Sequence, residues 1–317
     1  ERNSLVGSEM CIRDRSTTHS FSNEIAVFGE VLADIFPDKY VLGGAPFNVA
    51  RHLRGFGMHP VFITRTGQDA LKDELLNEMH ARNMETIGVQ HDPVYPTGQV
   101  KVTLVEGNAD YEILPDQAYD FIHAGMTHMI TMAIKPEIAY FGTLAQRSDK
   151  SRLALDRFLS DCKCPRILDI NLRKPWYSKH TITRSLRRAD VVKLNEDELT
   201  VVAQAAAITT KDPEAQADAL IAKFDLAEVV VTCGAKGAWV MDQGRHVTHA
   251  AVTTQAKLVD TVGAGDAFAA VYMLGMLNGW DIPSRLQHAN RFASEICGVR
   301  GAVPEDMHLY TQLRQAW

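Results

Sequence analysis

Residues 260–270 read DTVGAGDAFAA, a run of small residues that leads into an apolar segment predicted to be a helix over residues 264–277. Free backbone N–H groups at a helix start attract anions, and the helix dipole adds to this attraction. Asp266 lies in the first turn, within reach of any group that these amides hold. An anion pocket beside a carboxylate suits phosphoryl transfer, in which catalysis is mostly positioning and charge stabilisation. The residues suit equally a tightly packed helix start with a dipole-favourable acid, so both interpretations stay open.

Strands and helices alternate along most of the chain that precedes this segment. Short apolar runs predict strands at residues 25–28, 61–63, 138–141, 167–170, 191–194, 229–232 and 239–241. Apolar residues at helical spacing predict helices at residues 47–56, 68–82, 150–162, 196–206, 214–224, 264–277 and 283–299. Alternation at this spacing indicates parallel strands with right-handed crossovers, so the expected fold class is α/β, a doubly wound, mostly parallel sheet flanked by helices.

Residues 98–114 follow a different pattern. Apolar and polar residues alternate with a period of two, and a turn is expected at Gly107 and Asn108. This pattern is typical of an antiparallel hairpin with one wet face. A small sheet of this kind inside an α/β chain suggests a flap rather than a part of the main sheet.

Composition excludes several classes of partner. The 317-residue chain has a formal net charge of −6 and no long basic run, which argues against a nucleic-acid-coating protein. The best apolar run, residues 267–277, is shorter than the about 20 residues of a membrane span. No nucleic-acid or membrane partner is therefore expected. The five cysteines are odd in number and lack the spacing of a zinc knuckle, so free thiols in a reducing cytoplasm are expected.

Residues 1–23 carry a balanced charge and no apolar core of a signal peptide. We interpret them as a disordered leader or an artefact of gene-start choice and assign one domain to residues 24–317. No Walker phosphate loop, zincin motif or serine-hydrolase motif occurs in the sequence.

Two motifs together resemble a known family. Residues 43–50 read GGAPFNVA, with Gly57 and Gly67 following at the expected distances, and they are similar to the N-terminal signature of the PfkB (ribokinase-like) carbohydrate kinases. Residues 260–270 match the C-terminal signature of that family in their polar and glycine positions. The resemblance runs from Glu24 to the C-terminus. It implies a ribokinase-like kinase domain with a β lid formed by about residues 32–42 and 98–114.

The resemblance also implies roles for residues at the phosphate-transfer end of the site. Asp266 falls on the catalytic base, and the amides of Gly263, Ala264 and Gly265 fall on the anion hole. Glu198 would bind Mg²⁺ through water, because magnesium dehydrates reluctantly. Asn195 and Glu198 also have the form of a helix capping box, and both readings can hold together. The implied nucleotide-binding residues are Asn195, Glu198, Thr232, Gly234, Gly237 and Asn290.

On the sugar side, the resemblance implies that Asp34 accepts two hydroxyl hydrogen bonds. Gly43 and Gly44 permit close backbone approach, and Asn48 offers both a donor and an acceptor. Arg173 follows a strand end, which in an open α/β sheet faces the ligand crevice. A structural salt bridge is the alternative role for Arg173. A potassium site, frequent in the family, has Asp260 and Val262 as its candidates.

The segments at residues 141–145 and 297–302 resemble bacterial fructokinases, and residues 169–176 are similar to both fructokinases and 2-keto-3-deoxygluconate kinases. This resemblance implies transfer of the ATP γ-phosphate to the 6-hydroxyl of D-fructose, with Mg²⁺, in a homodimer that pairs through the lid. A 2-keto-3-deoxygluconate kinase is the close alternative, with Arg173 on the substrate carboxylate. A ribokinase or nucleoside kinase is less favoured. A sugar- or nucleotide-binding sensor without catalysis is the alternative from another class.

Two departures from the family pattern stand out. Lys72 replaces the last glycine of the usual Gly-x-Asp-x-x-Gly, so the turn after Gly67 is expected to differ. Residues 124–135 show little alternation and are expected to form a loop without a counterpart in the family.

Overall fold

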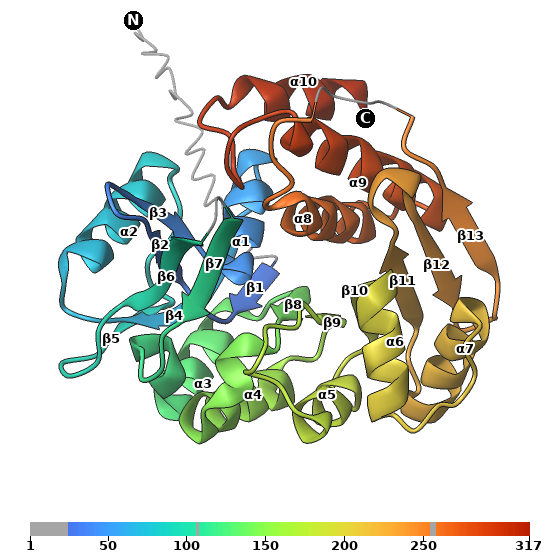
Figure 1. Cartoon of the computed structure of the whole chain (residues 1–317), viewed down its shortest axis with the longest axis horizontal. Helices are drawn as coiled ribbons and strands as arrows, with labels where there is room; N and C mark the ends of the chain where they lie inside the picture. Colours follow the sequence, from blue (N-terminus) through green and yellow to red (C-terminus); the bar gives the residue numbers. More distant parts are fainter. Residues whose placement is uncertain (1–24, 106–107, 254–257) are drawn as a thin grey trace, which may run out of the picture.

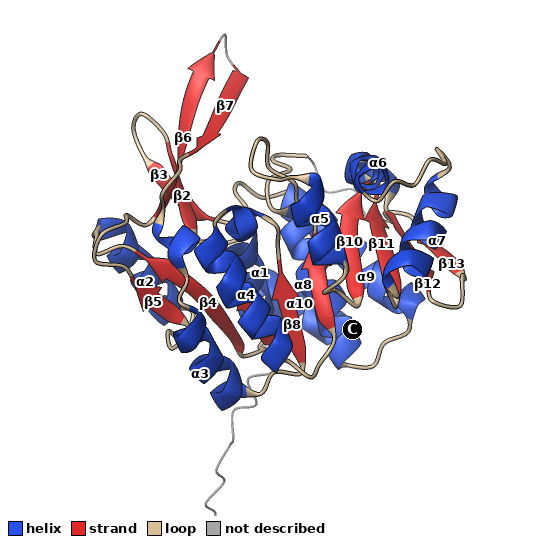
Figure 2. Cartoon of the chain, turned by 90° about the horizontal axis from the view of Figure 1, so that it is seen from below, coloured by secondary structure: helices blue, strands red, loops and turns tan. Residues whose placement is uncertain are grey.

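The computed structural model describes residues 25–105, 108–253 and 258–317. The leader predicted at residues 1–23 lies outside the described residues, as does Gly107 of the hairpin turn. A large central sheet has helices on both faces, and a smaller sheet stands over one end of it (Figures 1 and 2). Within the described residues, none of the helices combines the length and apolar character needed to cross a membrane.

The central sheet has nine strands in the order β13-β12-β11-β10-β9-β8-β1-β4-β5. Their bounds are β1 (Ile25–Phe28), β4 (Pro60–Thr66), β5 (Val89–His91), β8 (Ile138–Phe141), β9 (Arg166–Asp169), β10 (Val191–Asn195), β11 (Glu228–Thr232), β12 (Ala238–Asp242) and β13 (Val247–Ala250). All neighbours from β5 to β11 pair in parallel, whereas β12 and β13 are antiparallel. The predicted fold class, a doubly wound and mostly parallel sheet, is confirmed.

The helices divide between the two faces of the central sheet. Their bounds are α1 (Ala45–Gly55), α2 (Ala70–Ala81), α3 (Ala124–Ile134), α4 (Asp149–Asp161), α5 (Lys179–Leu186), α6 (Glu196–Ala205), α7 (Pro213–Phe224), α8 (Ala264–Leu277), α9 (Ile282–Cys297) and α10 (His308–Ala316). Three short 3-10 helices are η1 (Ala118–Phe121), η2 (Leu144–Arg147) and η3 (Gly234–Lys236). Successive side chains of β1 point to opposite faces: Ala26 and Phe28 join the core under α3 to α7, and Ile25 and Val27 join the core under α1, α2 and α8 to α10. Both faces are covered, which is why β1 is apolar at every position.

The smaller sheet has the order β3-β2-β6-β7. Its strands are β2 (Leu32–Ile35), β3 (Tyr40–Gly43), β6 (Gly98–Val105) and β7 (Asn108–Ile113). The β6–β7 pair is the antiparallel hairpin that the alternation predicts, with Val100 and Val102 buried and Lys101 exposed. In Figure 2 this hairpin projects on the side toward which β10 and β11 point. The sheet therefore stands beside the carboxyl ends of the parallel strands, and its action as a lid stays a prediction.

The prediction of a loop at residues 124–135 is wrong, because this segment forms helix α3. His123 caps its start through Nδ1, which accepts a hydrogen bond from the amide of Met126. The apolar pattern did not predict a helix because Met129, at 71% exposure, lies on the solvent side while Ile130 is buried. Apolar residues on both faces remove the amphipathic signal of a surface helix. Lys72 is accommodated in the first turn of α2, where no positive φ is required.

Candidate active site

The predicted base lies at the start of α8. Gly263 is the N-cap residue, with φ 81° and ψ −4°, and no side chain caps the helix. A Cβ at Gly263 would lie 2.6 Å from the Cα atom of Ala302, so only glycine fits this left-handed position. The amide of Ala264 reaches Thr261 O at 3.4 Å, and within the described part of the chain the amides of Gly265 and Asp266 have no acceptor outside the helix. The helix start can therefore offer amides to an anion.

Asp266 faces α1 rather than its own helix start. Its Oδ2 atom accepts a hydrogen bond of 2.8 Å from Nδ2 of Asn48, which joins the two signature motifs. Burial raises the pKa of Asp266 to about 6, and the charge of Asp169 adds to this rise, whereas the Asn48 hydrogen bond, Lys193 and Arg173 lower it. A carboxylate with a pKa of about 6 is mostly ionised at neutral pH and close to the range that suits a general base.

A buried ion pair lies beneath the helix start. Lys193 Nζ lies 2.9 and 3.1 Å from the two carboxylate oxygens of Asp169, and the hydroxyl of Tyr140 donates to the same carboxylate at 3.1 Å. A Cβ on Gly265 would lie 3.1 Å from Lys193 Nζ, so the ammonium stands directly against the glycine turn. The sequence analysis missed these residues. A lysine inside the otherwise apolar run 191–194 was the available signal.

Glu30 is a second residue that the sequence analysis missed. It follows β1, is 5% exposed, and its Oε2 atom has no hydrogen-bond partner within the described residues. Burial raises the pKa of Glu30 to about 7; the charge of Asp266 raises it further, and Arg173 and Arg147 lower it. An acid two residues after the fully apolar strand at residues 25–28 was the signal for it.

The predicted sugar-binding residues converge from different elements. Asp34 is half-buried in β2, and burial raises its pKa, against the lowering effect of Arg173. A Cβ on Gly43 would come within 4.0 Å of Asp34 Oδ2, and one on Gly44 would lie 2.8 Å from the carbonyl oxygen of Glu30. Gly43 thus borders the Asp34 carboxylate, and Gly44 borders the main chain at Glu30.

Arg173 is exposed, and among the described residues its guanidinium forms no ion pair and donates only to Leu172 O at 3.5 Å. Its charge lowers the pKa values of Glu30, Asp34 and Asp266, so it faces all three acids. The structural salt bridge considered for Arg173 is wrong. An unpaired cation among carboxylates is instead available to a ligand.

Asn195 and Glu198 form the capping box at the start of α6. Asn195 Oδ1 accepts from the amide of Glu198 at 2.8 Å, and Glu198 Oε2 accepts from the amide of Asn195 at 3.0 Å. Glu198 Oε1 accepts from the amide of Leu172 at 2.8 Å. Each oxygen keeps a lone pair, and a carboxylate that meets Mg²⁺ through water is consistent with this donor set.

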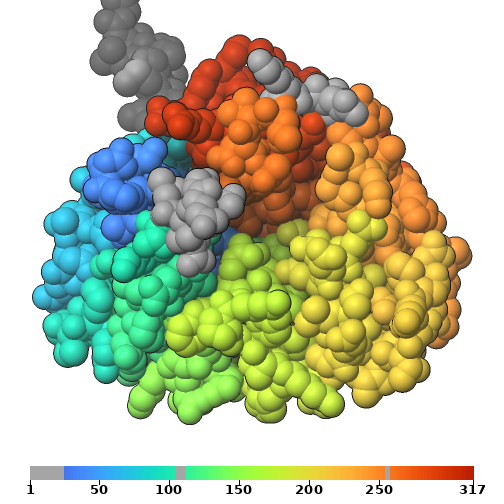
Figure 3. Space-filling model, viewed as in Figure 1, coloured from blue at the N-terminus to red at the C-terminus, as the bar shows by residue number. Residues whose placement is uncertain are grey.

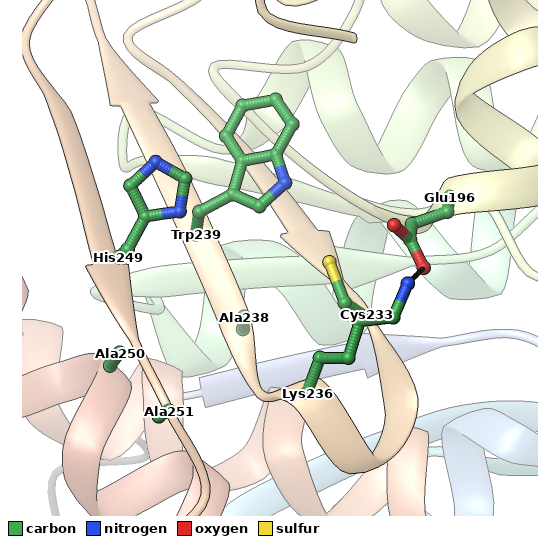
Figure 4. Close-up of a pocket in the computed structure, with 8 residues that line it drawn as sticks. All are labelled: Glu196, Cys233, Lys236, Ala238, Trp239, His249, Ala250 and Ala251. Carbon is green, nitrogen blue, oxygen red and sulfur yellow. Dashed lines mark ion pairs between the residues drawn. The ribbon is translucent and has the colours of Figure 1, made fainter.

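A pocket of about 320 Å³ lies next to the loop after β11, and its lining residues Cys233, Lys236 and Ala238 are sequence neighbours of the predicted Thr232, Gly234 and Gly237 (Figure 4). Trp239 and His249 form one wall, and Lys236, paired with Glu196 at 3.8 Å, lies on the other. Gly234 and Gly237 have positive φ values of 55° and 102°. The pocket is lined by Glu196, Cys233, Lys236, Ala238, Trp239, His249, Ala250 and Ala251.

Asn290 and Thr232 hold this region together. Asn290 is 4% exposed and donates from Nδ2 to the carbonyl oxygen of Ala250 at 2.8 Å, so it is not a solvated residue on the helix surface. The hydroxyl of Thr232 donates to Leu194 O at 3.4 Å.

Asp260 joins two loops near the start of α8. Its Oδ1 atom accepts from the amide of Val262 at 3.0 Å, and its Oδ2 atom accepts from the amide of Gly301 at 3.2 Å. These bonds link the segment before α8 to the segment after α9. Potassium binding at Asp260 and Val262 stays a prediction.

In the space-filling view, the face of the molecule that is also seen in Figure 1 is hollowed between the orange C-terminal segments and the yellow-green middle of the chain (Figure 3).

The chain is similar to one protein family and to several solved structures. The model of the pfkB family carbohydrate kinases matches residues 6–307. The chain is 27% identical over 314 residues to probable fructokinase-6, chloroplastic, of Arabidopsis thaliana, covering 88% of this chain and 79% of that protein. The structure of a Xylella fastidiosa fructokinase with bound ATP is similar with a TM-score of 0.82 at 20% identity, covering 93% of this chain and 99% of the other. A Vibrio cholerae fructokinase double mutant with fructose, ADP and potassium bound has a TM-score of 0.76 at 24% identity, covering 92% and 98%.

Proposed function

The chain belongs to the pfkB family of carbohydrate kinases, and from this premise we propose that it transfers the γ-phosphate of ATP to the 6-hydroxyl group of D-fructose. Its activity is that of a phosphotransferase acting on a sugar hydroxyl. Fructose is supported by relatives named fructokinase, such as the Arabidopsis protein. The observation that carries the proposal is the 2.8 Å bond from Asn48 to Asp266, because it brings the sugar-side motif against an acid at an uncapped helix start.

In the proposed reaction, Asp266 accepts the proton of the sugar hydroxyl as that oxygen attacks the γ-phosphorus. The bond from the γ-phosphorus to the β,γ-bridging oxygen breaks, and ADP leaves. The phosphoryl group lies against the amides of Gly263, Ala264 and Gly265, which stabilise its developing charge. Lys193 adds a positive charge beneath the same turn. Mg²⁺ bound with ATP would neutralise phosphate charge, and Glu198 would hold it through water.

The sugar is proposed to lie between β2 and the start of α1. Asp34 accepts its hydroxyl groups, and Gly43 and Gly44 let the backbone approach the ring. Asn48 uses one N–H on Asp266, which leaves its second N–H for the substrate. Closure of the small sheet would exclude water that otherwise hydrolyses ATP.

A 2-keto-3-deoxygluconate kinase is the second candidate. The observation that favours it is the exposed guanidinium of Arg173, which could bind a substrate carboxylate. A coupled assay over fructose, 2-keto-3-deoxygluconate, ribose and adenosine separates the candidates by kcat/KM. Preference for the keto acid would overturn fructose as substrate. Tight sugar binding without ATP consumption would overturn catalysis itself and leave a sensor.

The remaining predictions concern nucleotide, cation and assembly. We propose that ATP lies along Thr232, Gly234 and Gly237 toward Asn290, and that K⁺ supports activity near Asp260. The small sheet exposes apolar side chains at Tyr40, Val41 and Tyr111, with exposed fractions of 45%, 42% and 54%. These side chains support a homodimer that pairs through this sheet, which sedimentation of the wild type and Tyr111→Lys would test. A cytoplasmic location stays a prediction.

A further inference from the structure

The guanidinium of Arg51 lies one helical turn after Asn48 and is buried, with 7% of the residue exposed. Its Nη2 atom donates to Asn48 Oδ1 at 2.6 Å and to the carbonyl oxygen of Leu42 at 3.3 Å. Its Nη1 atom donates to Glu78 Oε1 at 3.3 Å. One buried cation thus connects the end of β3, helix α2 and the side-chain amide of Asn48.

These contacts decide which way the amide of Asn48 points. An asparagine amide has an accepting oxygen on one side and a donating NH₂ on the other. The cation holds the oxygen of Asn48, so the NH₂ group is directed to Asp266 Oδ2 at 2.8 Å. A flipped amide would place its oxygen against the Asp266 carboxylate and its NH₂ against the guanidinium. Both contacts are repulsive, so Arg51 selects one orientation.

We propose that Arg51 is a positioning residue for phosphoryl transfer: it holds the Asn48 amide in the orientation that donates to Asp266 and thereby keeps that carboxylate aimed and ionised. This inference rests on the proposed function, in which Asp266 accepts the proton.

Other charged groups face the same carboxylate and set the background against which Arg51 acts. Those that change the pKa of Asp266 or are changed by its charge are Asp169 of β9, Lys193 of β10, Tyr140 of β8, Glu30 after β1 and Arg173 after β9. Those that face Arg51 are Glu78 of α2, Arg82 directly after α2, His52 of α1 and Tyr310 of α10, with the ring of Phe47 4.5 Å from the guanidinium carbon. None of these groups contacts the Asn48 oxygen, so within the described structure Arg51 holds the oxygen side of the amide while Asp266 accepts from its NH₂ side.

The first test is the pH profile of kcat/KM in Arg51→Met. Without the cation the Asn48 oxygen loses its partner and the amide is held less firmly against Asp266. The hydrogen bond to the ionised carboxylate is therefore weakened, and the acid limb is expected to move up by about one pH unit. Arg54→Met is the matched control: it also removes a guanidinium from α1, but one that donates to the carbonyl oxygens of Arg82 and Met58. The control should leave the acid limb in place. An acid limb that is the same in Arg51→Met and the wild type would overturn the proposal.

A double-mutant cycle separates positioning from general stabilisation. In Asn48→Ala, removal of Arg51 should move the acid limb no further, because the amide that it orients is gone. Equal shifts on both backgrounds would contradict the proposal. If Arg51→Met does not fold, Arg51→Lys takes its place. Lysine keeps the positive charge but lacks the planar guanidinium with its several donors, so a smaller upward shift of the acid limb is expected. An unchanged acid limb in Arg51→Lys would equally contradict the proposal.

Carboxyl ¹³C NMR titration of Asp266, assigned by loss of its signal in Asp266→Asn, reads the same effect without a substrate. A higher pKa of Asp266 in Arg51→Met, in a protein that phosphorylates none of the sugars tested, would support the positioning role while the proposed function fails. An unchanged pKa of Asp266 in an active sugar kinase would overturn the positioning role alone.

Discussion

The starts of α6 and α8 place an acid at the same helical position and use it in opposite ways. Glu198 and Asp266 each stand three residues after the N-cap residue. In α6 the N-cap is Asn195, and the carboxylate of Glu198 folds back to accept the amide of its own cap. In α8 the N-cap is Gly263, no side chain caps the helix, and Asp266 turns outward to Asn48.

The difference lies in the cap residue. Asn195 supplies an oxygen that satisfies the amide of Glu198, so this start is closed by its own side chains. Gly263 supplies no side chain and adopts a left-handed conformation, so the amides of α8 and the Asp266 carboxylate remain for something outside the helix. The missing side-chain cap leaves the start of α8 open to a ligand, and within the described residues Asp266 has one side-chain hydrogen bond, to Asn48, which is consistent with its proposed role as a base.

The sharpest test of this comparison is Asp266→Asn. Removal of the base is expected to lower kcat by about 100-fold or more, with little change in KM for the sugar. Asparagine preserves shape and the contact with Asn48, so the loss should lie in proton transfer. Steady-state kinetics with the preferred sugar measure both constants, and wild-type turnover in this variant would remove Asp266 from the mechanism.

Asp34 is a carboxylate away from any helix start, and its variant separates binding from chemistry. Asp34→Ala is expected to raise KM for the sugar by roughly tenfold or more, because a hydrogen bond to a charged group is worth about 1.5–3 kcal/mol. The value of kcat should fall much less than in Asp266→Asn. Unchanged KM in steady-state assays would contradict its assignment to the sugar.

Glu198→Gln tests the closed helix start. A neutral amide has only one accepting oxygen, so either the amide of Asn195 or that of Leu172 loses its partner. The expected loss is about 1–3 kcal/mol of unfolding free energy, measured by urea denaturation. Glu196→Gln, on the exposed side of the same first turn, is the control and should change stability little. Equal stability of the two variants would break the comparison.

Most of the architecture could be predicted from local patterns. The run at residues 25–28 is apolar throughout because β1 is covered on both faces, and residues 98–103 alternate because β6 has one buried and one exposed side. Such patterns depend on whether each position is buried or exposed, so they can be recognised in a short stretch of sequence without knowledge of distant contacts. Helix α3 was not predicted because its exposed methionines remove the contrast between an apolar buried face and a polar exposed face.

The candidate site was less predictable because its properties come from pairs of distant residues. The motifs indicated Asp266 and Asn48, but no spacing shows that they bond, or that Arg51 holds the far side of the amide. In the sequence, Lys193 is a charge within an apolar strand, and Glu30 is a charge two residues after one. Their importance follows from which strands are neighbours in the sheet, and that depends on the whole topology.

The last prediction concerns the cost in unfolding free energy of burying the Asp266 carboxylate with few hydrogen bonds. Burial raises the pKa of Asp266 to about 6, above its ordinary value of 3.8, so between these two values the native state binds more protons than the unfolded state. The contribution of Asp266 therefore stabilises the fold at low pH and is lost as pH rises through about 6. Asp266→Asn lacks this titration, so we expect it to unfold at a higher temperature than the wild type at pH 8.

The advantage of Asp266→Asn should shrink toward pH 4, where the wild-type carboxyl is protonated and also neutral. Thermal unfolding of the two proteins at each pH measures the difference, in which the titration of the other groups largely cancels. A wild type that is the more stable protein at pH 8, or a difference that does not change with pH, would contradict the prediction. Either result would mean that burial of the ionised Asp266 carboxylate at the uncapped start of α8 does not destabilise the fold.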